Sequence, residues 1–326
     1  MNEYPAGGAG RIGRPARLFR IAWILLLVLG GAGASGDAPP CRQCMPPATL
    51  SFVTNGQRLN GGSFNAARGF RLGPSRLEIS AEGSLLTGVD PSGKHIAGQE
   101  LVGARFSGRL DDGKPVQMKV AAVSRHPDPA QDDTYLYDIR FLAKRRWDPI
   151  CGTGDDGRPV LSILVAGTWN DREGVPGGGS WDGSPGRFTF ACQGFVLAKC
   201  VESGYKPWKT AKVCGSDGSC KDVPLGPYHR ACVRMMRADY CGNGRSYTLD
   251  GTPINLYDSI GIETDTEDWP IEAEWDETGA RCLTHLRVPG QGTPPCAAKL
   301  AAHDCGDKKH FGTGTLLMDE SFERFK

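Results

Sequence analysis

The 326-residue sequence predicts a β-rich α+β protein, in which an antiparallel β region precedes a disulfide-stapled domain with short helices. Apolar and polar residues alternate in several short runs, as they do in half-buried strands. The chain contains twelve cysteines, and an even number is typical of a disulfide framework in an exported protein. These observations together favour short strands held by turns and by disulfides.

The composition sets limits on the class of protein. Glycine (45 residues) and proline (23 residues) make up about a fifth of the chain, which is below the roughly 25–30% typical of disordered proteins. The length is enough for one or two domains with a real core. The net charge of +1 implies no bulk polyelectrolyte partner, so we expect no nucleic-acid binding.

The first 34 residues have the pattern of an export signal. Four arginines precede an apolar run, Ile21–Leu29, and Ala32-Gly33-Ala34 forms an A-x-A cleavage site. The apolar run is shorter than the ~20 residues that a membrane helix needs. We expect cleavage after Ala34 and a periplasmic or extracellular protein, with an uncleaved anchor as the alternative. Residues 35–48 then form a flexible, proline-rich leader, and no later segment is predicted to span a membrane.

The region 49–146 carries the clearest strand patterns. Apolar residues alternate with polar ones in Leu77–Ser80, Val116–Val120 and Tyr135–Phe141. Turn residues such as Asp112-Gly113 separate the runs. We therefore expect a β-rich N-terminal region.

A second region, 147–290, follows. Strands are predicted for Val160–Val165 and Arg187–Cys192, with a short helix at 194–202. The glycine-rich segment 173–186 lacks the Lys-Ser/Thr pair that follows in a phosphate-binding loop, so we interpret it as a mobile turn.

The segment around residues 226–244 predicts a helix whose cysteines join it to other elements of the second region. Gly226-Pro227 can open a helix, no Gly or Pro interrupts Tyr228–Ala238, and Gly242-Asn243-Gly244 ends it. The helical period places two groups of residues on different faces. One face is a cationic stripe of Arg230, Arg234 and Arg237. The other contains the residues expected to be buried, Cys232, Met235 and Met236.

Several unusual strings in this region resemble a known family. They are Phe188-Thr-Phe-Ala-Cys192, Lys199-Cys-Val201, Gly204-Tyr-Lys-Pro-Trp208, Ala238-Asp-Tyr-Cys241 and Asp250-Gly-Thr252. In this order they resemble the bacterial ADYC domain family over roughly residues 145–290. The family has no established activity, so the resemblance implies no reaction, substrate or ligand. Asn243 departs from the pattern, where an acidic residue is expected.

The cysteine spacing predicts six disulfides. Short-range candidates are Cys41–Cys44, Cys214–Cys220 and Cys296–Cys305. On a helix, Cys232 and Cys241 lie too far apart to pair, and so do Cys192 and Cys200. The two segments can instead pair with each other. An antiparallel arrangement gives Cys192–Cys241 and Cys200–Cys232, leaving Cys151–Cys282, and a parallel one swaps the partners. A zinc or redox role for the Cys41-x-x-Cys44 spacing is the weaker alternative.

The segment 258–277 holds nine carboxylates and no Lys or Arg. A strand over residues 271–276 would place Glu272, Glu274 and Asp276 on one face. Glu272 and Glu274 are the candidate catalytic pair if the protein is an enzyme, since such a pair suits sugar hydrolysis. Calcium binding and a plain solvated face are the other interpretations. The tail 291–326 is expected to contain a short Ala-rich helix and a local disulfide.

The remaining candidate residues point to binding rather than catalysis. His229 and Asp239 would lie about 15 Å apart on a continuous helix and cannot form a dyad. Tyr205 and Trp208 sit on a proline-containing loop that can bind carbohydrate or peptide, or can pack on the core. Arg230, Arg234 and Arg237 either meet the acidic segment or form a docking surface.

We therefore expect a non-catalytic exported binding or envelope-associated module, with a secreted carboxylate-dependent hydrolase as the alternative. No cofactor is expected. The partners expected are a protein or a glycan of the cell envelope.

Overall fold

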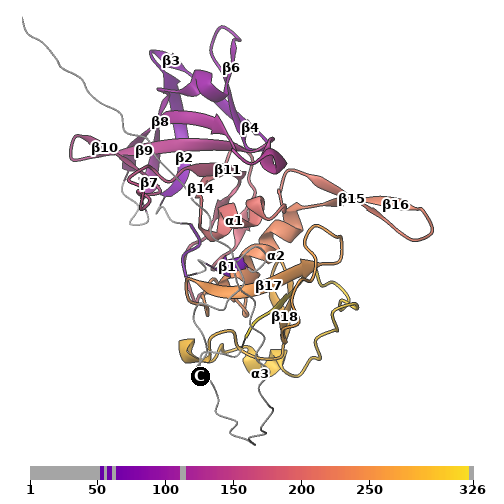
Figure 1. Cartoon of the computed structure of the whole chain (residues 1–326). Helices are drawn as coiled ribbons and strands as arrows, with labels where there is room; N and C mark the ends of the chain where they lie inside the picture. The colour runs from indigo at the N-terminus through magenta and orange to yellow at the C-terminus, as the bar shows by residue number, and fades with distance from the viewer. Residues whose placement is uncertain (1–51, 55–56, 61–63, 111–114, 323–326) are drawn as a thin grey trace, which may run out of the picture. The chain divides into compact units, whose positions relative to one another are not determined.

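Strands make up most of the regular structure, and the predicted β-rich α+β class is confirmed (Figure 1). The computed structural model describes residues 52–54, 57–60, 64–110 and 115–322, all within one unit, Ala48–Lys326. The predicted signal peptide and leader, and the proposed Cys41–Cys44 pair, lie outside the described residues.

The largest sheet contains eight antiparallel strands in the order β14-β11-β9-β8-β7-β2-β3, with β10 paired to β9. Its strands come from both sides of residue 147. They are β2 (Phe64–Leu72), β3 (Ser75–Arg76), β7 (Arg105–Leu110), β8 (Pro115–Arg125), β9 (Tyr135–Ala143), β10 (Arg146–Pro149), β11 (Ser162–Ala166) and β14 (Phe188–Cys192).

One face of this sheet encloses an apolar core. On β7 and β8, Phe106 and Met118 point inward while their neighbours in sequence are exposed or half-buried, as the period of two in a strand requires. The rings of Phe70 and Phe188 lie 6.0 Å apart, although their strands, β2 and β14, are far apart in the strand order. The sheet therefore curls around its core.

A three-stranded sheet covers the same core with strands β4 (Glu78–Glu82), β5 (Leu85–Val89) and β6 (His95–Ala97). Leu86 and Ile96 contribute its buried side chains. The buried Tyr137 hydroxyl fastens this sheet to the larger one, because it accepts a hydrogen bond from the Leu86 amide and donates one to the Ser84 carbonyl. A 3-10 helix, Gly98–Leu101, follows β6.

A second sheet of five antiparallel strands has the order β1-β17-β20-β18-β19. Its strands are β1 (Phe52–Thr54), β17 (Thr252–Asp258), β18 (Ile271–Asp276), β19 (Gly279–Leu283) and β20 (Leu317–Glu320). The predicted strand over 271–276 is confirmed. The C-terminal segment, for which only a short helix and a local disulfide were predicted, supplies the central strand β20, whose four residues are all buried.

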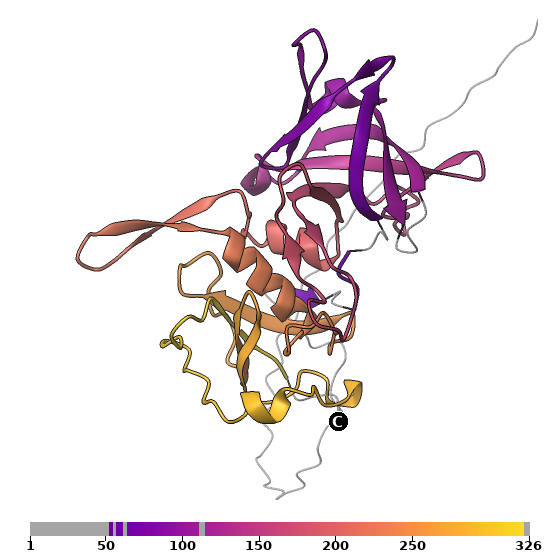
Figure 2. The same cartoon turned by 180° about the vertical axis from the view of Figure 1, so that it is seen from behind.

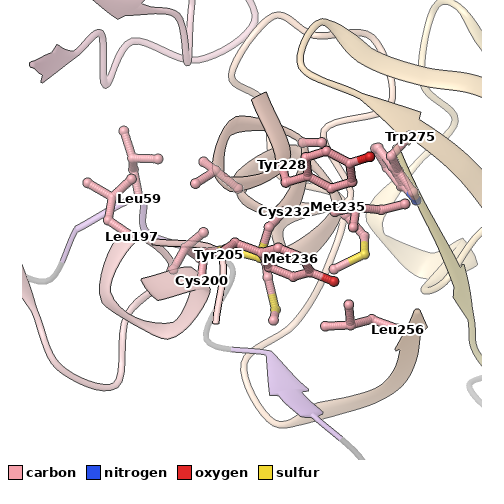
Figure 3. Packing of buried hydrophobic residues seen from close by; sticks show 14 of the residues in the cluster. Leu59, Leu197, Cys200, Tyr205, Tyr228, Cys232, Met235, Met236, Leu256 and Trp275 are labelled. Atoms are coloured by element: carbon pink, nitrogen blue, oxygen red, sulfur yellow. A yellow bond between two sulfur atoms is a disulfide. The ribbon is translucent and has the colours of Figure 1, made fainter. Parts of the chain in front are cut away.

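Two helices pack together between the sheets, α1 (Val196–Glu202) and α2 (Gly226–Arg237). Figure 3 shows that Cys232, Met235 and Met236 of α2 meet Leu197 and Cys200 of α1 in one apolar cluster, so the face predicted to be buried is confirmed. The remaining elements are β12 (Thr168–Trp169), β13 (Trp181–Asp182), β15 (Thr210–Cys214), β16 (Cys220–Pro224), α3 (Ala297–Leu300) and the 3-10 helices Pro129–Gln131 and Pro289–Gln291. Strands β15 and β16 form a hairpin that extends away from the helices (Figure 2).

Five disulfides join ten of the cysteines in the described part of the chain. They are Cys151–Cys192, Cys200–Cys232, Cys214–Cys220, Cys241–Cys296 and Cys282–Cys305. So many disulfides indicate an oxidising, extracytoplasmic setting. Among the helices that the structure describes, none combines the length and the hydrophobicity needed to cross a bilayer.

The predicted pairings are partly right. Cys200–Cys232 and Cys214–Cys220 are confirmed, and neither Cys192–Cys200 nor Cys232–Cys241 forms. The pairings Cys192–Cys241, Cys151–Cys282 and Cys296–Cys305 are wrong. Cys192, at the end of β14, pairs with Cys151. The tail packs back on two earlier segments. Cys296 therefore pairs with Cys241, which follows α2, and Cys305 pairs with Cys282 of β19.

Candidate functional site

The Ala-Asp-Tyr-Cys segment begins where α2 ends. Ala238 has a left-handed backbone (φ 50°), and this ends the helix before the glycines that the sequence analysis assigned to that role. The next residue, Asp239, is fully buried and accepts hydrogen bonds from the amides of Asn243 (3.0 Å) and Gly244 (2.8 Å). Arg234 pairs with the same carboxylate. Asp239 therefore shapes the Gly-Asn-Gly turn and is held by the helix that precedes it.

The glycine-rich loop over 173–186 is held against this turn. Arg234 donates to the Gly178 carbonyl (3.1 Å), and the Gly174 amide donates to the Asn243 carbonyl (3.0 Å). A Cβ atom at Gly178 would overlap the Asn243 carbonyl, so the two segments fit only because glycine lacks a side chain. The prediction of a mobile turn is wrong here, because the loop packs on Asn243 and Gly244.

The three arginines of the α2 stripe all have acidic partners within the domain. Arg230 pairs with Glu277 of the acidic segment, and Arg237 pairs with Glu173 (2.6 Å). Arg234 and Arg237 are buried and Arg230 is half-buried. The structure thus uses the stripe to join α2 to its neighbours, and we propose no docking role for it.

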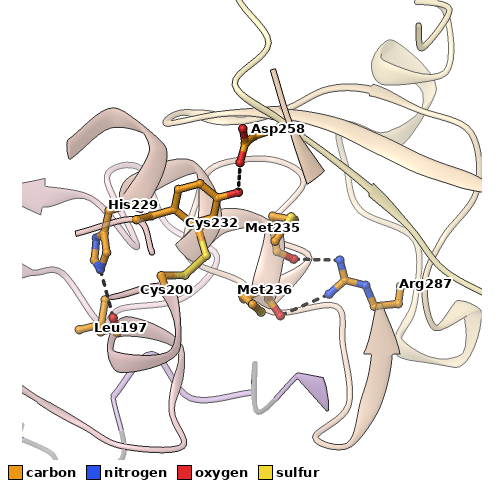
Figure 4. Close-up of a disulfide and its surroundings, with 9 residues drawn as sticks. Leu197, Cys200, His229, Cys232, Met235, Met236, Asp258 and Arg287 are labelled. Atoms are coloured by element: carbon orange, nitrogen blue, oxygen red, sulfur yellow. Dashed lines mark hydrogen bonds between the residues drawn. A yellow bond between two sulfur atoms is a disulfide. The ribbon is translucent and has the colours of Figure 1, made fainter. Parts of the chain in front are cut away.

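Arg287 occupies the centre of a buried polar cluster beside α2. Its guanidinium pairs with Glu272 (2.9 Å) and Asp319 (2.6 Å), and all three side chains are completely inaccessible to solvent. Figure 4 shows that the same guanidinium donates to the carbonyls of Met235 and Met236 at the end of α2. A cation at this position satisfies unpaired helix carbonyls and the negative end of the helix dipole.

The two candidate catalytic carboxylates are both enclosed. Glu272 accepts a hydrogen bond from the Tyr240 hydroxyl (2.9 Å) in addition to its pairing with Arg287. Glu274 is 3% exposed and accepts from the Gly306 amide, the Gly312 amide and the Thr315 hydroxyl. Both are therefore committed to contacts inside the domain, and the solvated acidic face that alternation indicated does not form. Register shifts in β18, after Ile271 and after Glu274, accompany this change.

The aromatic candidates of the Gly-Tyr-Lys-Pro-Trp loop pack inward. Tyr205 is fully buried, and its hydroxyl donates to Asp258 (2.7 Å), which Figure 4 includes. Trp208 is half-buried, and its ring lies against Gly83 of the β4–β5 turn. Between them Lys206 pairs with Asp133. Burial raises the pKa of Asp133, but hydrogen bonds from Lys206 and Lys209 outweigh it and bring the value to about 2.

His229 is buried near the start of α2, where Nε2 donates to the Leu197 carbonyl (3.1 Å; Figure 4). Burial lowers the pKa of His229 to about 4, so the ring is neutral at pH 7. Its side chain joins α2 to α1.

The carboxylates of the acidic segment are dispersed over separate contacts. Asp258 accepts from the amides of Ile260 (2.7 Å) and Glu263 (2.8 Å), and Asp276 pairs with Arg281. Burial and then the Asp258 charge raise the pKa of Glu263 to about 7. Among the described residues, no three His, Cys, Asp or Glu side chains are grouped so that they could hold a metal ion.

A row of cations crosses the exposed face of the eight-stranded sheet. Directly opposite positions on β3, β2, β7, β8 and β9 are occupied by Arg76, Arg71, Arg105, Lys119 and Arg140, which we name the cationic row. Neighbouring members stand on adjacent strands, which lie about 4.8 Å apart. Five strands therefore carry a continuous line of positive side chains about 19 Å long.

The cationic row has one acidic partner among the described residues. Arg140 pairs with Asp138 (2.8 Å) at one end. Within the described part of the chain, no carboxylate forms an ion pair with the other four members. Arg71, Arg76 and Arg105 are exposed, and Lys119 is half-buried. Like charges directly opposite each other on paired strands are destabilising, so the row costs stability that no carboxylate in the described chain offsets at these four positions.

A short groove lies beside Arg71 and Arg105 in the middle of the row. It has a volume of about 630 Å³ and is lined by residues that include Arg71, Arg105 and Gln117, with the glycines Gly73 and Gly103. A Cβ atom at either glycine would meet nothing within 4 Å, so the space beside the cations is open. The groove therefore gives a ligand access to the charged side chains.

Trp147 on β10 also stands beside the row. Lys119 lies 4.8 Å from the centre of its ring and Arg105 lies 5.9 Å from it. The ring is half-buried and holds both cations by cation–π attraction. At the tip of the β9–β10 hairpin, Lys144 (φ 46°) and Arg145 (φ 71°) both have left-handed backbones, which are unusual for residues with side chains.

The cationic row was not predicted from the sequence. The local signal is present, because Arg71 and Arg105 each lie beside an inward-facing phenylalanine. What assembles the row is the pairing register of five strands, and the register cannot be read from one strand alone. The net charge of +1 also conceals it, because a sum over the chain does not report a local line of like charges.

These features define a β-rich, disulfide-stapled protein of an oxidising, extracytoplasmic setting. A family model described as the ADYC domain matches residues 98–289. The match covers more than half of the chain, so the chain belongs to the ADYC domain family. It includes Arg105, Lys119 and Arg140 of the cationic row and the whole of α2. No curated protein and no solved structure matches the chain.

Proposed function

We propose that the protein is an exported, non-catalytic binding module of the periplasm or the extracellular space, and that its cationic row holds an anionic ligand. One observation carries the proposal: four cations stand opposite one another on paired strands, and none of them has an acidic partner among the residues that the structure describes. Such a line is unfavourable in the free protein. An anion bound along the row would remove the repulsion, so anion binding explains why the arrangement exists.

The other candidate sites support the choice of this surface. The α2 arginines, Tyr205 and the two glutamates of β18 all have partners inside the domain. The carboxylate-dependent hydrolase stays an alternative, and its test is the activity of folded Glu272→Gln and Glu274→Gln variants. The cationic row is where charged side chains are left for an external partner.

The test is binding of a panel of polyanions at low ionic strength by the disulfide-intact protein. The panel contains polygalacturonate, inorganic polyphosphate, single-stranded DNA and phosphatidylglycerol vesicles. The row variant Arg71→Gln/Arg105→Gln/Lys119→Gln is compared with a matched control that loses the same charge elsewhere, Arg187→Gln/Lys212→Gln/Lys221→Gln.

The wild-type protein and the control should bind at least one polyanion, and the row variant should bind it roughly tenfold more weakly. Added salt should weaken the binding, since ions screen exposed charges beyond about 10 Å at 0.1 M. Equal binding by the row variant and the control would contradict the proposal, as would a wild-type protein that binds none of the four.

A further inference from the structure

We infer that the ligand of the cationic row is a linear acidic polysaccharide with one carboxylate on each sugar, lying across the strands. The inference rests on the proposed function, since it names the class of anion that the row would hold. Three properties of the surface support this class: the spacing of the cations, the neutral polar group beside them and the shape of the groove.

The spacing of the row sets the repeat of the ligand. Cations on adjacent strands recur about every 4.8 Å, which matches the length of one sugar unit in an extended chain. Three of the five members are exposed arginines, and a guanidinium can bind a carboxylate through two parallel hydrogen bonds. The row is thus about as long as five successive sugar units, and its exposed arginines can bind carboxylates along such a chain.

The surroundings of the row suit a sugar better than a bare anion. Gln117 lines the groove beside Arg105, and its amide can both donate to and accept from hydroxyl groups. Gly73 and Gly103 leave room for a ring to approach the backbone. Trp147, which contacts Lys119 and Arg105, adds a half-buried apolar ring that can pack against the C–H side of a sugar.

Two other polyanions fit the surface less well. Single-stranded nucleic acid binds through several aromatic side chains on which successive bases stack, and the face of the cationic row has one, Trp147, in the described structure. A membrane surface calls for a broad apolar patch that enters the lipid. The exposed large apolar side chains of the described chain, Val102, Leu142 and Trp181, stand on three different segments.

The experiment uses oligogalacturonates of two to six units and their fully methyl-esterified forms, which have the same backbone without the charge. Affinity measured by calorimetry should rise with each added unit up to about five units and then level off. The esterified oligomers should not bind measurably. The row variant should lose roughly tenfold in affinity for the pentamer, and the matched control should lose nothing.

A second variant tests sugar recognition apart from charge. Gln117→Leu keeps every cation and removes the polar group beside them. It should weaken oligogalacturonate binding several-fold through the lost hydrogen bonds and leave polyphosphate binding unchanged. Unaltered thermal unfolding of this variant shows that its fold is intact.

The outcomes separate this inference from the proposed function. If polyphosphate, DNA or vesicles bind in a row-dependent manner while the oligogalacturonates bind no better than their esters, the ligand class is wrong and the anion site stands. Affinity that does not depend on length would also overturn the polysaccharide inference. If no anion shows row-dependent binding, both proposals fail.

Discussion

The guanidinium of Arg287 donates a 2.6 Å hydrogen bond to the carboxylate of Asp319, and neither side chain is accessible to solvent. The same cation pairs with Glu272, so one positive charge serves two buried acids. Burial raises the pKa of Asp319 well above its usual value, and the neighbouring Glu272 charge raises it further. Burial and the neighbouring negative charge therefore both favour the protonated form of Asp319.

The raised pKa of Asp319 predicts different effects for two substitutions in this cluster. Asp319→Asn resembles the protonated acid, keeps the Arg287–Glu272 pair and should have little effect on stability near neutral pH. Arg287→Gln leaves both acids without their cation and should cost about 3–5 kcal/mol. Urea unfolding of both variants measures the difference. Equal losses would show that Asp319 is ionised in the folded protein.

The raised pKa of Asp319 also makes the stability of the protein depend on pH. Because folding raises the pKa of Asp319, its protonated form stabilises the fold at low pH, and this contribution is lost as the pH rises through the folded-state value. Asp319→Asn should remove that loss, so the variant should gain stability relative to the wild-type protein as the pH is raised.

The lowered pKa of His229 predicts the opposite dependence of stability on pH, between pH 6.5 and 4. Its pKa is lowered from 6.5 to about 4 by burial. Below pH 6.5 the unfolded chain binds a proton that the folded protein excludes, so the unfolding free energy should fall by about 3 kcal/mol between pH 6.5 and 4. His229→Gln can still donate to Leu197 and should lack this contribution. His95→Gln, at an exposed position, is the control and should keep the wild-type profile.

The disulfides should differ in their contribution to stability. Cys200–Cys232 spans 32 residues between two fully buried side chains, whereas Cys214–Cys220 spans 6 residues on an exposed hairpin. Replacing both cysteines of the first by alanine should cost about 2–4 kcal/mol, and the same change in the second should cost less. Thermal unfolding compares the two variants. Mild reduction should open Cys214–Cys220 first, and an equal rate for both would contradict this.

The stability of the protein should be sensitive to substitution of one glycine of the Gly-Asn-Gly turn in particular. Gly242 has φ +63°, and a Cβ atom there would overlap the Thr278 carbonyl. Gly251 has φ +87° but open space around it. Alanine at either position brings about 1 kcal/mol of left-handed strain, and only Gly242→Ala adds a steric overlap. Denaturant unfolding should therefore show a clearly larger loss for Gly242→Ala than for Gly251→Ala.

The cationic row should be dispensable for folding. Arg105→Gln removes a charge that faces like charges on both sides, so stability at low salt should stay constant or rise by about 0.2–1 kcal/mol. Arg234→Gln, which breaks a buried pair with Asp239, should instead cost about 3–5 kcal/mol. If Arg105→Gln is as damaging as Arg234→Gln, Arg105 has a structural role, and the argument for a binding surface is lost.

Local patterns in the sequence were enough for part of the fold. Helix α2 and its buried face followed from an uninterrupted helical period, and the phase of that helix correctly excluded a Cys232–Cys241 pair. The remaining pairings depend on how β14 and the tail are arranged in space. Cys296 and Cys305 are close in sequence, but each is drawn to a partner on another element.

The candidate site was harder to predict because its parts are distant in sequence. Alternation in residues 271–276 suggested a solvated acidic face, yet the partners of Glu272 and Glu274 come from Arg287 and from the loop before β20. The cationic row likewise exists only once five strands pair in register. Charge alone does not distinguish an exposed strand face from one that the rest of the chain will cover.

The central position of β20 has a consequence for the order of folding. Strands β17 and β18 cannot complete their sheet until residues 317–320 arrive between them, although both are made earlier. A nascent chain would therefore keep this sheet open until residues 317–320 are available. The same delay would help a protein that crosses a membrane unfolded, since its sheet and the Cys241–Cys296 and Cys282–Cys305 bonds would close only on the far side.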